Sequence, residues 1–183
     1  MRKGLKSSFL FFFCKQDSDV ENFIRHEAIE YEKIGRSRTF IIYDEDGDEF
    51  KILAYFTLAI KVLGVNKDLL SIKKTKELDG KSSKNYGRKI TEFPTILIGQ
   101  IAKNDKYAEF IDGLEIMQYC ISMVLLGQSI LGGRIVMLEC KNIQKIIDLY
   151  QKFGFEILSQ DETSGLLQMI RVIRETDHLH IFI

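Results

Sequence analysis

The stretch Leu149-Tyr150-Gln151-Lys152-Phe153-Gly154-Phe155 marks the end of a helical pattern in the last third of the chain. Apolar residues recur there at helical spacing: Ile143, Ile146, Ile147, Tyr150 and Phe153. The spacing predicts an amphipathic helix that begins after Asn142, and Gly154 is the residue type that commonly ends one. On such an apolar face, Tyr150 is either a core residue with a hydrogen-bonded tip or a functional hydroxyl.

Strands and helices alternate on both sides of this helix. The patterns upstream predict a strand from Pro94 to Ala102, a helix from the capping pair Asp112 and Glu115 to Gly132-Gly133, and a strand from Arg134 to Cys140. Downstream, Phe155 to Ser159 and Leu166 to Ile173 predict a closing hairpin.

The N-terminal half has its own pattern of β-rich and helical segments. It predicts a strand over Phe9 to Cys14, a helix from the capping pair Ser18 and Glu21 to Gly35, and strands over Thr39 to Tyr43 and Phe50 to Ile60. The acidic turn from Asp44 to Asp48 favours a hairpin over a calcium loop, because its glycine comes one place early and no glutamate closes a twelve-residue loop. Ser71 to Lys89 is expected to be a polar, basic loop.

Composition favours one globular domain. The 183 residues are 45% hydrophobic, and 26 basic and 26 acidic side chains cancel, so no global charge attracts nucleic acid or anionic lipid. The 3 cysteines lack metal-ligand spacing and favour a reducing, cytoplasmic location. The apolar run Phe9 to Cys14 is too short for a membrane span, so no membrane partner is expected, and no metal site is predicted.

The element order resembles that of the GNAT superfamily of N-acetyltransferases. Ile96 to Ala102 looks like the family's fourth strand, and Leu149 to Phe155 is similar to its Leu-Tyr-x-x-x-Gly-Phe signature. The resemblance implies an α+β, three-layer fold with a mixed, mostly antiparallel sheet flanked by helices. It further implies a single domain over residues 1–183, with a tail of about 174–183, that moves acetyl from acetyl-CoA to an amine.

The resemblance also implies roles for particular residues. Tyr150 would be the general acid that protonates the departing CoA thiolate. The pantetheine arm of acetyl-CoA would bind along the strand that ends at Ile101 and Ala102, and CoA affinity could also depend on Lys103 and Lys106 or on a shifted loop. Asn142 would contact pantetheine or, from its position alone, cap the helix that follows.

The family's pyrophosphate loop, Gln/Arg-x-x-Gly-x-Gly/Ala, aligns with Ala108-Glu109-Phe110-Ile111-Asp112-Gly113, where only Gly113 keeps the pattern. Asp112, Gly113 and Leu114 are the candidate cofactor residues, since backbone amides at a helix start can bind phosphate. Asp112 and Glu115 fit an N-terminal cap equally well, and a cap would use the amides that CoA needs.

Several functions therefore stay open. The first is an N-acetyltransferase of unspecified acceptor. The second is a toxin-like enzyme that acetylates aminoacyl-tRNA, because Phe13 to Ile24 and Ser37 to Phe40 resemble the GNAT toxin subgroup and Ser71 to Lys89 is basic. The third is a GNAT scaffold that serves as an interaction module. The superfamily also makes a homodimer an expectation, whereas a Cys140 nucleophile lacks a nearby histidine and is disfavoured.

Overall fold

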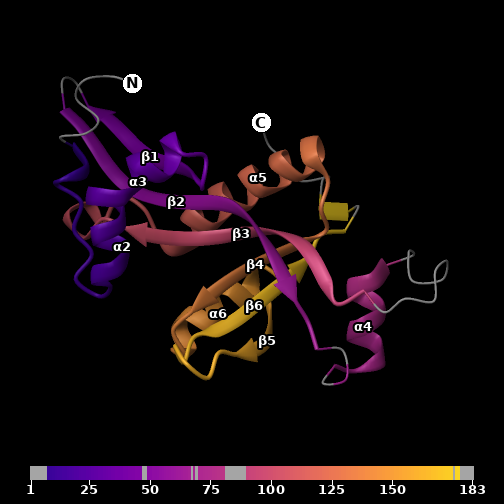
Figure 1. Ribbon diagram of the computed structural model, residues 1–183. Coiled ribbons are helices and arrows are strands. Elements are labelled where there is room, and N and C mark those ends of the chain that lie inside the picture. Colours follow the sequence, from indigo (N-terminus) through magenta and orange to yellow (C-terminus); the bar gives the residue numbers. More distant parts are fainter. Residues whose placement is uncertain are drawn as a thin grey trace. The chain divides into compact units, whose positions relative to one another are not determined.

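The computed structural model describes residues 8–46, 49–66, 68, 70–80, 90–174 and 176–177. The helices are α2 (Ser18–Asn22), the π-helical turn η1 (Phe23–Glu27), α3 (Ala28–Lys33), α4 (Ile72–Asp79), the 3-10 turn η4 (Asp105–Tyr107), α5 (Gly113–Leu131) and α6 (Gln144–Lys152). The strands are β1 (Arg38–Asp46), β2 (Glu49–Gly64), β3 (Glu92–Lys103), β4 (Ile135–Cys140), β5 (Glu156–Gln160) and β6 (Leu167–Val172) (Figure 1). The strands form a 6-stranded sheet in the order β1-β2-β3-β4-β6-β5. The predicted α+β fold is confirmed.

The chain divides into two compact units. The first comprises Met1–Ala59 and Ile98–Met123, and the second comprises Ile60–Leu97 and Val124–Ile183. The strands β2 and β3 and the helix α5 each continue from one unit into the other, so the division runs through regular elements rather than through linkers. Each unit has an apolar core of its own.

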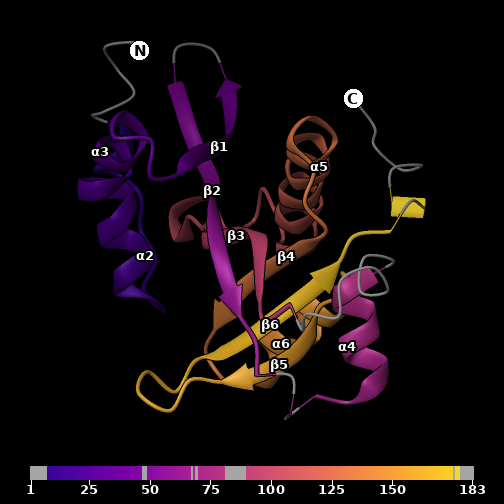
Figure 2. The same ribbon diagram turned by 45° about the vertical axis from the view of Figure 1, so that its right-hand side comes forward.

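In the first unit, apolar clusters cover both faces of β1 and β2. On one face, Ile24 of η1 and Ala28 of α3 pack with Tyr55. On the other face, Ile116 of α5 packs with Ala54. Neighbouring residues of a strand point to opposite faces, so Ala54 and Tyr55 anchor the two layers. Figure 2 shows α2 and α3 on one side of these strands and α5 on the other.

The predicted first helix is present, but it begins differently from the prediction. Asp17, and not Ser18, is the N-cap, and its Oδ1 accepts the backbone N–H of Asp19 at 3.2 Å. Glu21 does not complete a capping box, because its carboxylate accepts the backbone N–H of Cys14 instead. The middle of the helix is the π-helical turn η1, which the apolar spacing did not indicate.

The predicted first strand is wrong. Residues Phe9 to Cys14 form a helical turn followed by irregular backbone, and no strand. Phe12 is fully buried, and its ring meets Tyr55 edge-on with centroids 5.2 Å apart. The apolar run therefore packs on a face of the sheet rather than joining it, and β1 lies at the edge of the sheet.

The hairpin of β1 and β2 is confirmed and is longer than predicted. The strands pair antiparallel from Arg38 opposite Leu58 to Asp46 opposite Glu49. A shift in register leaves Leu53 as an extra residue on β2, so the bulge belongs to β2 and β1 is regular. The acidic turn includes residues 47 and 48, which lie outside the described residues, so the comparison with a calcium loop stays untested.

In the second unit, β4, β6 and β5 are successive antiparallel neighbours, which confirms the predicted closing hairpin. The basic segment Ser71 to Lys89 is not simply a loop. Ser71 Oγ accepts the backbone N–H of Lys74 at 3.1 Å and caps α4, and Leu78 of α4 packs into the core of this unit. Residues 81–89 lie outside the described part of the chain.

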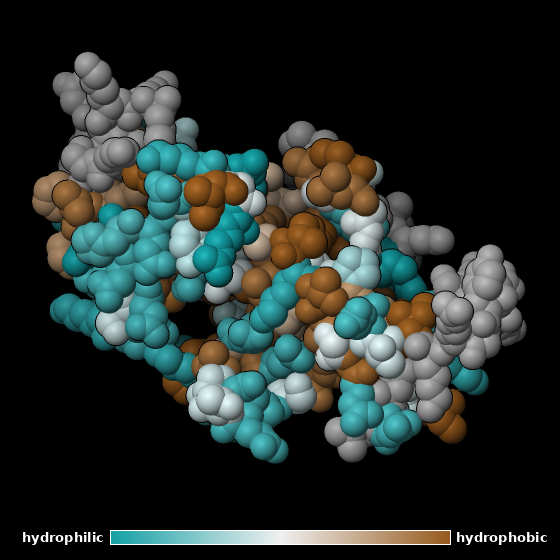
Figure 3. Space-filling model, in the orientation of Figure 1, coloured by the Kyte–Doolittle hydropathy of each residue, from teal (hydrophilic) through white to brown (hydrophobic). Residues whose placement is uncertain are grey.

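The helix α5 begins and ends where its capping pair and the Gly132-Gly133 turn predict. By length and composition it is the one helix among the described residues that could cross a membrane, a test that core helices of soluble proteins also pass. Its exposed apolar residues include Tyr119, Leu126 and Ile130, and Figure 3 shows hydrophobic surface over this helix.

Candidate functional site

The C-terminal end of β3, in the first unit, carries the predicted cofactor residues Ile101, Ala102 and Lys103. Ile101 packs against the cluster that contains Ile111, whereas Ala102 belongs to the cluster on the opposite face of the sheet. Lys103 turns toward the loop that follows, and its Nζ donates to the carbonyl oxygen of Ala108 at 3.2 Å. The Lys103 ammonium is therefore already engaged by the loop that aligns with the family's pyrophosphate site.

The start of α5 carries the predicted capping box. Asp112 Oδ1 accepts the backbone N–H groups of Leu114 at 2.8 Å and Glu115 at 2.9 Å. In return, Glu115 Oε2 accepts the backbone N–H of Asp112 at 2.9 Å. Gly113 lies between them as the first residue of the helix. The cap uses amides that a phosphate would need, and it adds two carboxylates at the positive end of the helix dipole.

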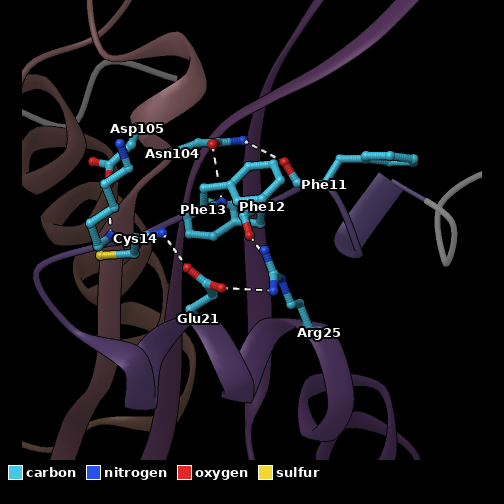
Figure 4. Close-up of polar contacts among 9 residues, drawn as sticks. Phe11, Phe12, Phe13, Cys14, Glu21, Arg25, Asn104 and Asp105 are labelled. Carbon is cyan, nitrogen blue, oxygen red and sulfur yellow. Dashed lines mark hydrogen bonds and ion pairs between the residues drawn. The ribbon is translucent and has the colours of Figure 1, made fainter.

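Asn104, the first residue after β3, is the centre of a network that the sequence did not predict (Figure 4). Its side chain is 1% exposed. The Oδ1 atom accepts the backbone N–H of Phe13 at 3.2 Å and that of Lys106 at 3.1 Å. The Nδ2 atom donates to the carbonyl oxygens of Ile52 at 2.9 Å and Phe11 at 3.4 Å. One amide thus joins the N-terminal segment, β2 and the loop after β3.

Two side chains of the first helix bind the other side of the N-terminal segment. Glu21 Oε2 accepts the backbone N–H of Cys14 at 2.7 Å, and Arg25 Nε donates to the carbonyl oxygen of Phe12 at 2.9 Å (Figure 4). Arg25 and Glu21 also form an ion pair at 2.7 Å, and the guanidinium lies 4.8 Å from the ring centroid of Phe13. These contacts explain how the N-terminal segment is fixed in place although it does not form a strand.

A cavity of about 260 Å³ adjoins this network. Its lining residues are Ser8, Phe11, Phe50, Ile52, Asn104, Lys106 and Tyr107. The lining is mainly aromatic and aliphatic, and Lys106 Nζ lies 4.9 Å from the ring centroid of Tyr107. Lys106 apart, none of the predicted cofactor residues lines it, so this cavity is not the site that the sequence predicts.

Tyr150 lies in the second unit, in the last turn of α6, and is 7% exposed. Its ring meets Phe155 edge-on with centroids 6.1 Å apart, and its carbonyl oxygen accepts the Phe155 N–H at 3.2 Å. Gly154, with φ of +76°, permits this reversal of the chain. The tyrosine and the glycine–phenylalanine pair of the signature therefore form one local structure.

Asn142 is exposed and does not cap α6. The N-cap is Ile143, whose side chain cannot accept a hydrogen bond. The backbone gives the reason, because the Ile143 N–H donates to the carbonyl oxygen of Lys141 at 2.8 Å and the helix begins one residue later than the asparagine would require. The predicted contact of Asn142 with pantetheine stays a prediction.

Cys140 has the environment of a core residue. It is 7% exposed, and its Sγ lies 3.8 Å from the Met169 Sδ. Burial raises the pKa of the Cys140 thiol, so the reactive thiolate is disfavoured. His26 is exposed in the first unit, whereas His178 and His180 lie outside the described residues.

Local sequence signals found part of this arrangement. The end of β3, the loop and the start of α5 come together in the first unit, and Tyr150 and Asn142 belong to the second. Sequence reasoning missed Asn104. An asparagine after an apolar strand commonly binds a backbone N–H two residues further on, as it does here, and this is the one signal that could have found it.

The sheet order and the helices together define the GNAT fold. Among solved structures, the chain is similar to AtaTR bound with AcCoA (TM-score 0.67, 17% identity, 95% of this chain and 91% of that chain). It is also similar to AtaT complexed with acetyl-methionyl-tRNAfMet (TM-score 0.67, 15% identity, 96% and 92%) and to a bacterial toxin (TM-score 0.65, 18% identity, 94% and 85%). No protein-family model and no curated protein sequence matches the chain.

Proposed function

We propose that this chain is an acetyl-CoA-dependent N-acetyltransferase. The observation that carries the proposal is its likeness, over 96% of its length, to AtaT solved with acetyl-methionyl-tRNAfMet. An acetyl-methionyl group is an acetylated amine, and the similar AtaTR was solved with AcCoA. The Tyr-to-Gly-Phe structure at the end of α6 supports the proposal from this chain's own residues.

In the proposed reaction, the lone pair of a neutral amine attacks the thioester carbonyl of acetyl-CoA. A C–N bond forms, the C–S bond breaks, the nitrogen loses a proton to solvent, and the departing thiolate takes one. We assign the donation of that second proton to Tyr150, because a phenol and an alkyl thiol are acids of similar strength. The packing against Phe155 would hold the phenol ring in one orientation.

Tyr150→Phe tests this assignment. The variant keeps the ring and its packing on Phe155 but removes the proton, so we expect kcat to fall by roughly a hundredfold while the Kd for CoA stays within about twofold. Tyr31→Phe is the matched control, since Tyr31 is a half-buried tyrosine that also makes an edge-on ring contact, with Phe23. Unchanged turnover in Tyr150→Phe would exclude Tyr150 as the acid.

A second candidate function is a GNAT scaffold without enzymatic activity. The capping box at the start of α5 favours it, because Asp112 and Glu115 use amide donors and repel a polyanion. Calorimetry with CoA and the wild-type chain separates the two functions. Saturable binding in the micromolar range supports the enzyme, and the absence of binding at millimolar CoA supports the scaffold.

We propose aminoacyl-tRNA as the acceptor, with α4 as a phosphate contact. Lys73 and Lys76 of this helix are exposed, whereas Lys74 is engaged by Glu77 at 3.2 Å and Glu156 at 2.8 Å. Burial alone would lower the pKa of Lys74, but hydrogen bonds to these carboxylates outweigh it and raise the pKa. The two outer lysines are therefore the better phosphate contacts.

This acceptor predicts that strong expression in bacteria arrests growth. Lys73→Glu/Lys76→Glu should relieve the arrest and weaken tRNA binding, while Lys74 and its two ion pairs stay intact. Lys145→Glu/Lys152→Glu on α6, where both lysines are exposed, is the matched control. Normal growth at high expression of the wild type, or equal relief by both pairs, counts against the tRNA acceptor at this surface.

We propose the cytoplasm as the location, with the free thiols of Cys14, Cys120 and Cys140 as support. Cell fractionation after tagged expression tests it. A homodimer is also proposed, on the ground of the superfamily resemblance, and light scattering on the purified chain tests it.

A further inference from the structure

The cavity beside Asn104 has an aromatic lining, and its lining residues all belong to the first unit. Phe11, Phe50 and Tyr107 contribute the rings. Phe11 is 61% exposed, and in Figure 4 its ring points away from the other residues of the Asn104 network. A large aromatic side chain that is exposed at a cavity is a common mark of a binding site.

The Asn104 amide fixes the backbone of three lining residues. Its Nδ2 atom donates to the carbonyl oxygens of Ile52 at 2.9 Å and Phe11 at 3.4 Å, and its Oδ1 atom accepts the backbone N–H of Lys106 at 3.1 Å. These three residues come from β2, the N-terminal segment and the turn after β3, so one side chain joins the walls of the cavity. A cavity that is formed in advance loses little conformational freedom when a ligand enters it.

The interior of the cavity offers few polar groups to a ligand. An amide side chain has two N–H donors and two lone pairs on its oxygen, and Asn104 uses all four within the protein. The hydroxyl groups of Ser8 and Tyr107 are the other neutral polar side-chain groups of the described lining. A nucleobase needs several hydrogen-bond partners along its edge and would leave polar atoms unpaired here. The lining therefore favours a ring with a largely hydrocarbon edge.

The charge of the lining selects the charge of the ligand. Among the described residues that line the cavity, Lys106 has the one charged side chain; the residue is exposed, and its Nζ lies 4.9 Å from the ring centroid of Tyr107. Aromatic walls can hold a quaternary ammonium, but the Lys106 ammonium would repel a cation at this place. A carboxylate on the ligand would instead be attracted to it.

The volume of the cavity indicates the size of the ring. An apolar cavity of about 150 Å³ can hold benzene. This cavity, at about 260 Å³, has room for two fused rings. We propose that it binds a fused aromatic ring that carries a carboxylate, with the ring against Phe11, Phe50 and Tyr107 and the carboxylate at Lys106. This site is separate from the proposed acetyl transfer and does not depend on it.

Indoleacetate is the probe, and the anisotropy of its fluorescence measures its binding to the full chain. The chain contains no tryptophan, so the indole fluorescence comes from the ligand alone. We expect a Kd between about 10 µM and about 1 mM for a ligand of this size. Indoleacetamide has the same shape without the charge and should bind about threefold more weakly, as for the loss of one exposed ion pair.

Lys106→Gln tests the carboxylate contact. The variant keeps the backbone N–H that Asn104 binds but removes the ammonium, so the preference for indoleacetate over indoleacetamide should disappear. Lys15→Gln is the matched control, because Lys15 is an exposed lysine of the same unit outside the cavity, and this variant should keep the preference. A preference that survives in Lys106→Gln would overturn the assignment of Lys106.

Phe11→Ala tests the ring contact. Loss of one aromatic wall should weaken both ligands about tenfold. Leu10→Ala is the control, since Leu10 is 53% exposed in the same segment but does not line the cavity. Circular dichroism of each variant shows whether it is folded.

Four results would overturn the proposal. They are no binding of indoleacetate in the millimolar range, equal weakening by Phe11→Ala and Leu10→Ala, tighter binding of adenosine monophosphate than of indoleacetate, and displacement of indoleacetate by CoA. The second result would place the ligand on another surface, the third would make the cavity a nucleotide site, and the fourth would make it part of the cofactor site.

Discussion

At the scale of single residues, Asn104 contributes more to the stability of the first unit than its position in a turn suggests. Its amide serves two N–H groups and two carbonyl oxygens, and the residue is 1% exposed. A buried backbone group left without a partner costs about 1–3 kcal/mol. Asn104→Ala leaves several such groups, and we expect the free energy of unfolding to fall by about 3 kcal/mol or more.

Urea denaturation followed by circular dichroism measures this change. Asn66→Ala is the matched control, because the Asn66 Oδ1 also accepts a backbone N–H, that of Asp68 at 3.1 Å, but the residue is exposed. The control should change stability by less than about 1 kcal/mol. Equal changes in the free energy of unfolding of the two variants would mean that burial of the Asn104 network contributes little to stability.

Asp177 links the last described residues to the strand β6. Its carboxylate lies 2.9 Å from Arg171 Nη2 and accepts the backbone N–H of Arg174 at 2.8 Å. Burial alone would raise the pKa of Asp177, but the Arg174 N–H and the Arg171 guanidinium outweigh it and lower the pKa below 3.8.

A lowered carboxyl pKa stabilises the protein above the unfolded-state pKa, and this contribution is lost as the pH falls through the folded-state pKa. Asp177→Asn should therefore unfold at a lower urea concentration than the wild type at about pH 7. The difference should shrink progressively as the pH falls below about 4 and through the lowered folded-state pKa. A difference that stays constant over this range would show that the ionised carboxylate is not its source.

At the scale of elements, the proposed binding of CoA depends on the start of α5, where the pyrophosphate would lie. Asp112→Asn keeps an oxygen that can cap the helix but removes a negative charge from its positive end, so CoA should bind about two- to fivefold more tightly. Asp17→Asn, at the N-cap of α2, is the matched control and should leave the Kd unchanged. Calorimetry provides both values. Weaker binding by Asp112→Asn would show that the carboxylate itself helps to hold CoA.

The elements also show which structures a sequence can predict. The helices α5 and α6 and the closing hairpin were predicted because their signals are local: apolar spacing, the glycines that follow the two helices and, for α5 alone, a correctly placed cap. The segment Phe9 to Cys14 was not, because its conformation depends on Asn104, 91 residues away from Phe13. The helix α4 was missed because its only buried residue is Leu78, and one apolar position gives no periodicity.

In the candidate site, too, contacts between near neighbours were predicted and contacts that depend on the path of the backbone were not. The capping box at Asp112 was readable from spacing alone, because a cap is a contact between near neighbours. The burial of Tyr150 also followed from its helical face. The engagement of Lys103 with the loop could not be read, since it depends on the path of the backbone between Asn104 and Ala108.

At the scale of the whole molecule, the two compact units raise the question of whether the chain is one domain, as its length and composition predict. Two strands and one helix belong to both units. If one half of such an element unfolded, the backbone hydrogen bonds where the two halves join would break and the other half would be destabilised. We therefore expect the units to unfold together, in one cooperative transition.

The absence of tryptophan makes this expectation easy to test. Phe50→Trp reports on the first unit and Phe153→Trp on the second, and both positions are half-buried aromatic sites whose fluorescence should change on unfolding. The two urea midpoints, each corrected for the stability of its variant by circular dichroism, should coincide. Separate midpoints, with the circular dichroism of each variant following both steps, would mean that the chain folds as two domains joined through β2, β3 and α5.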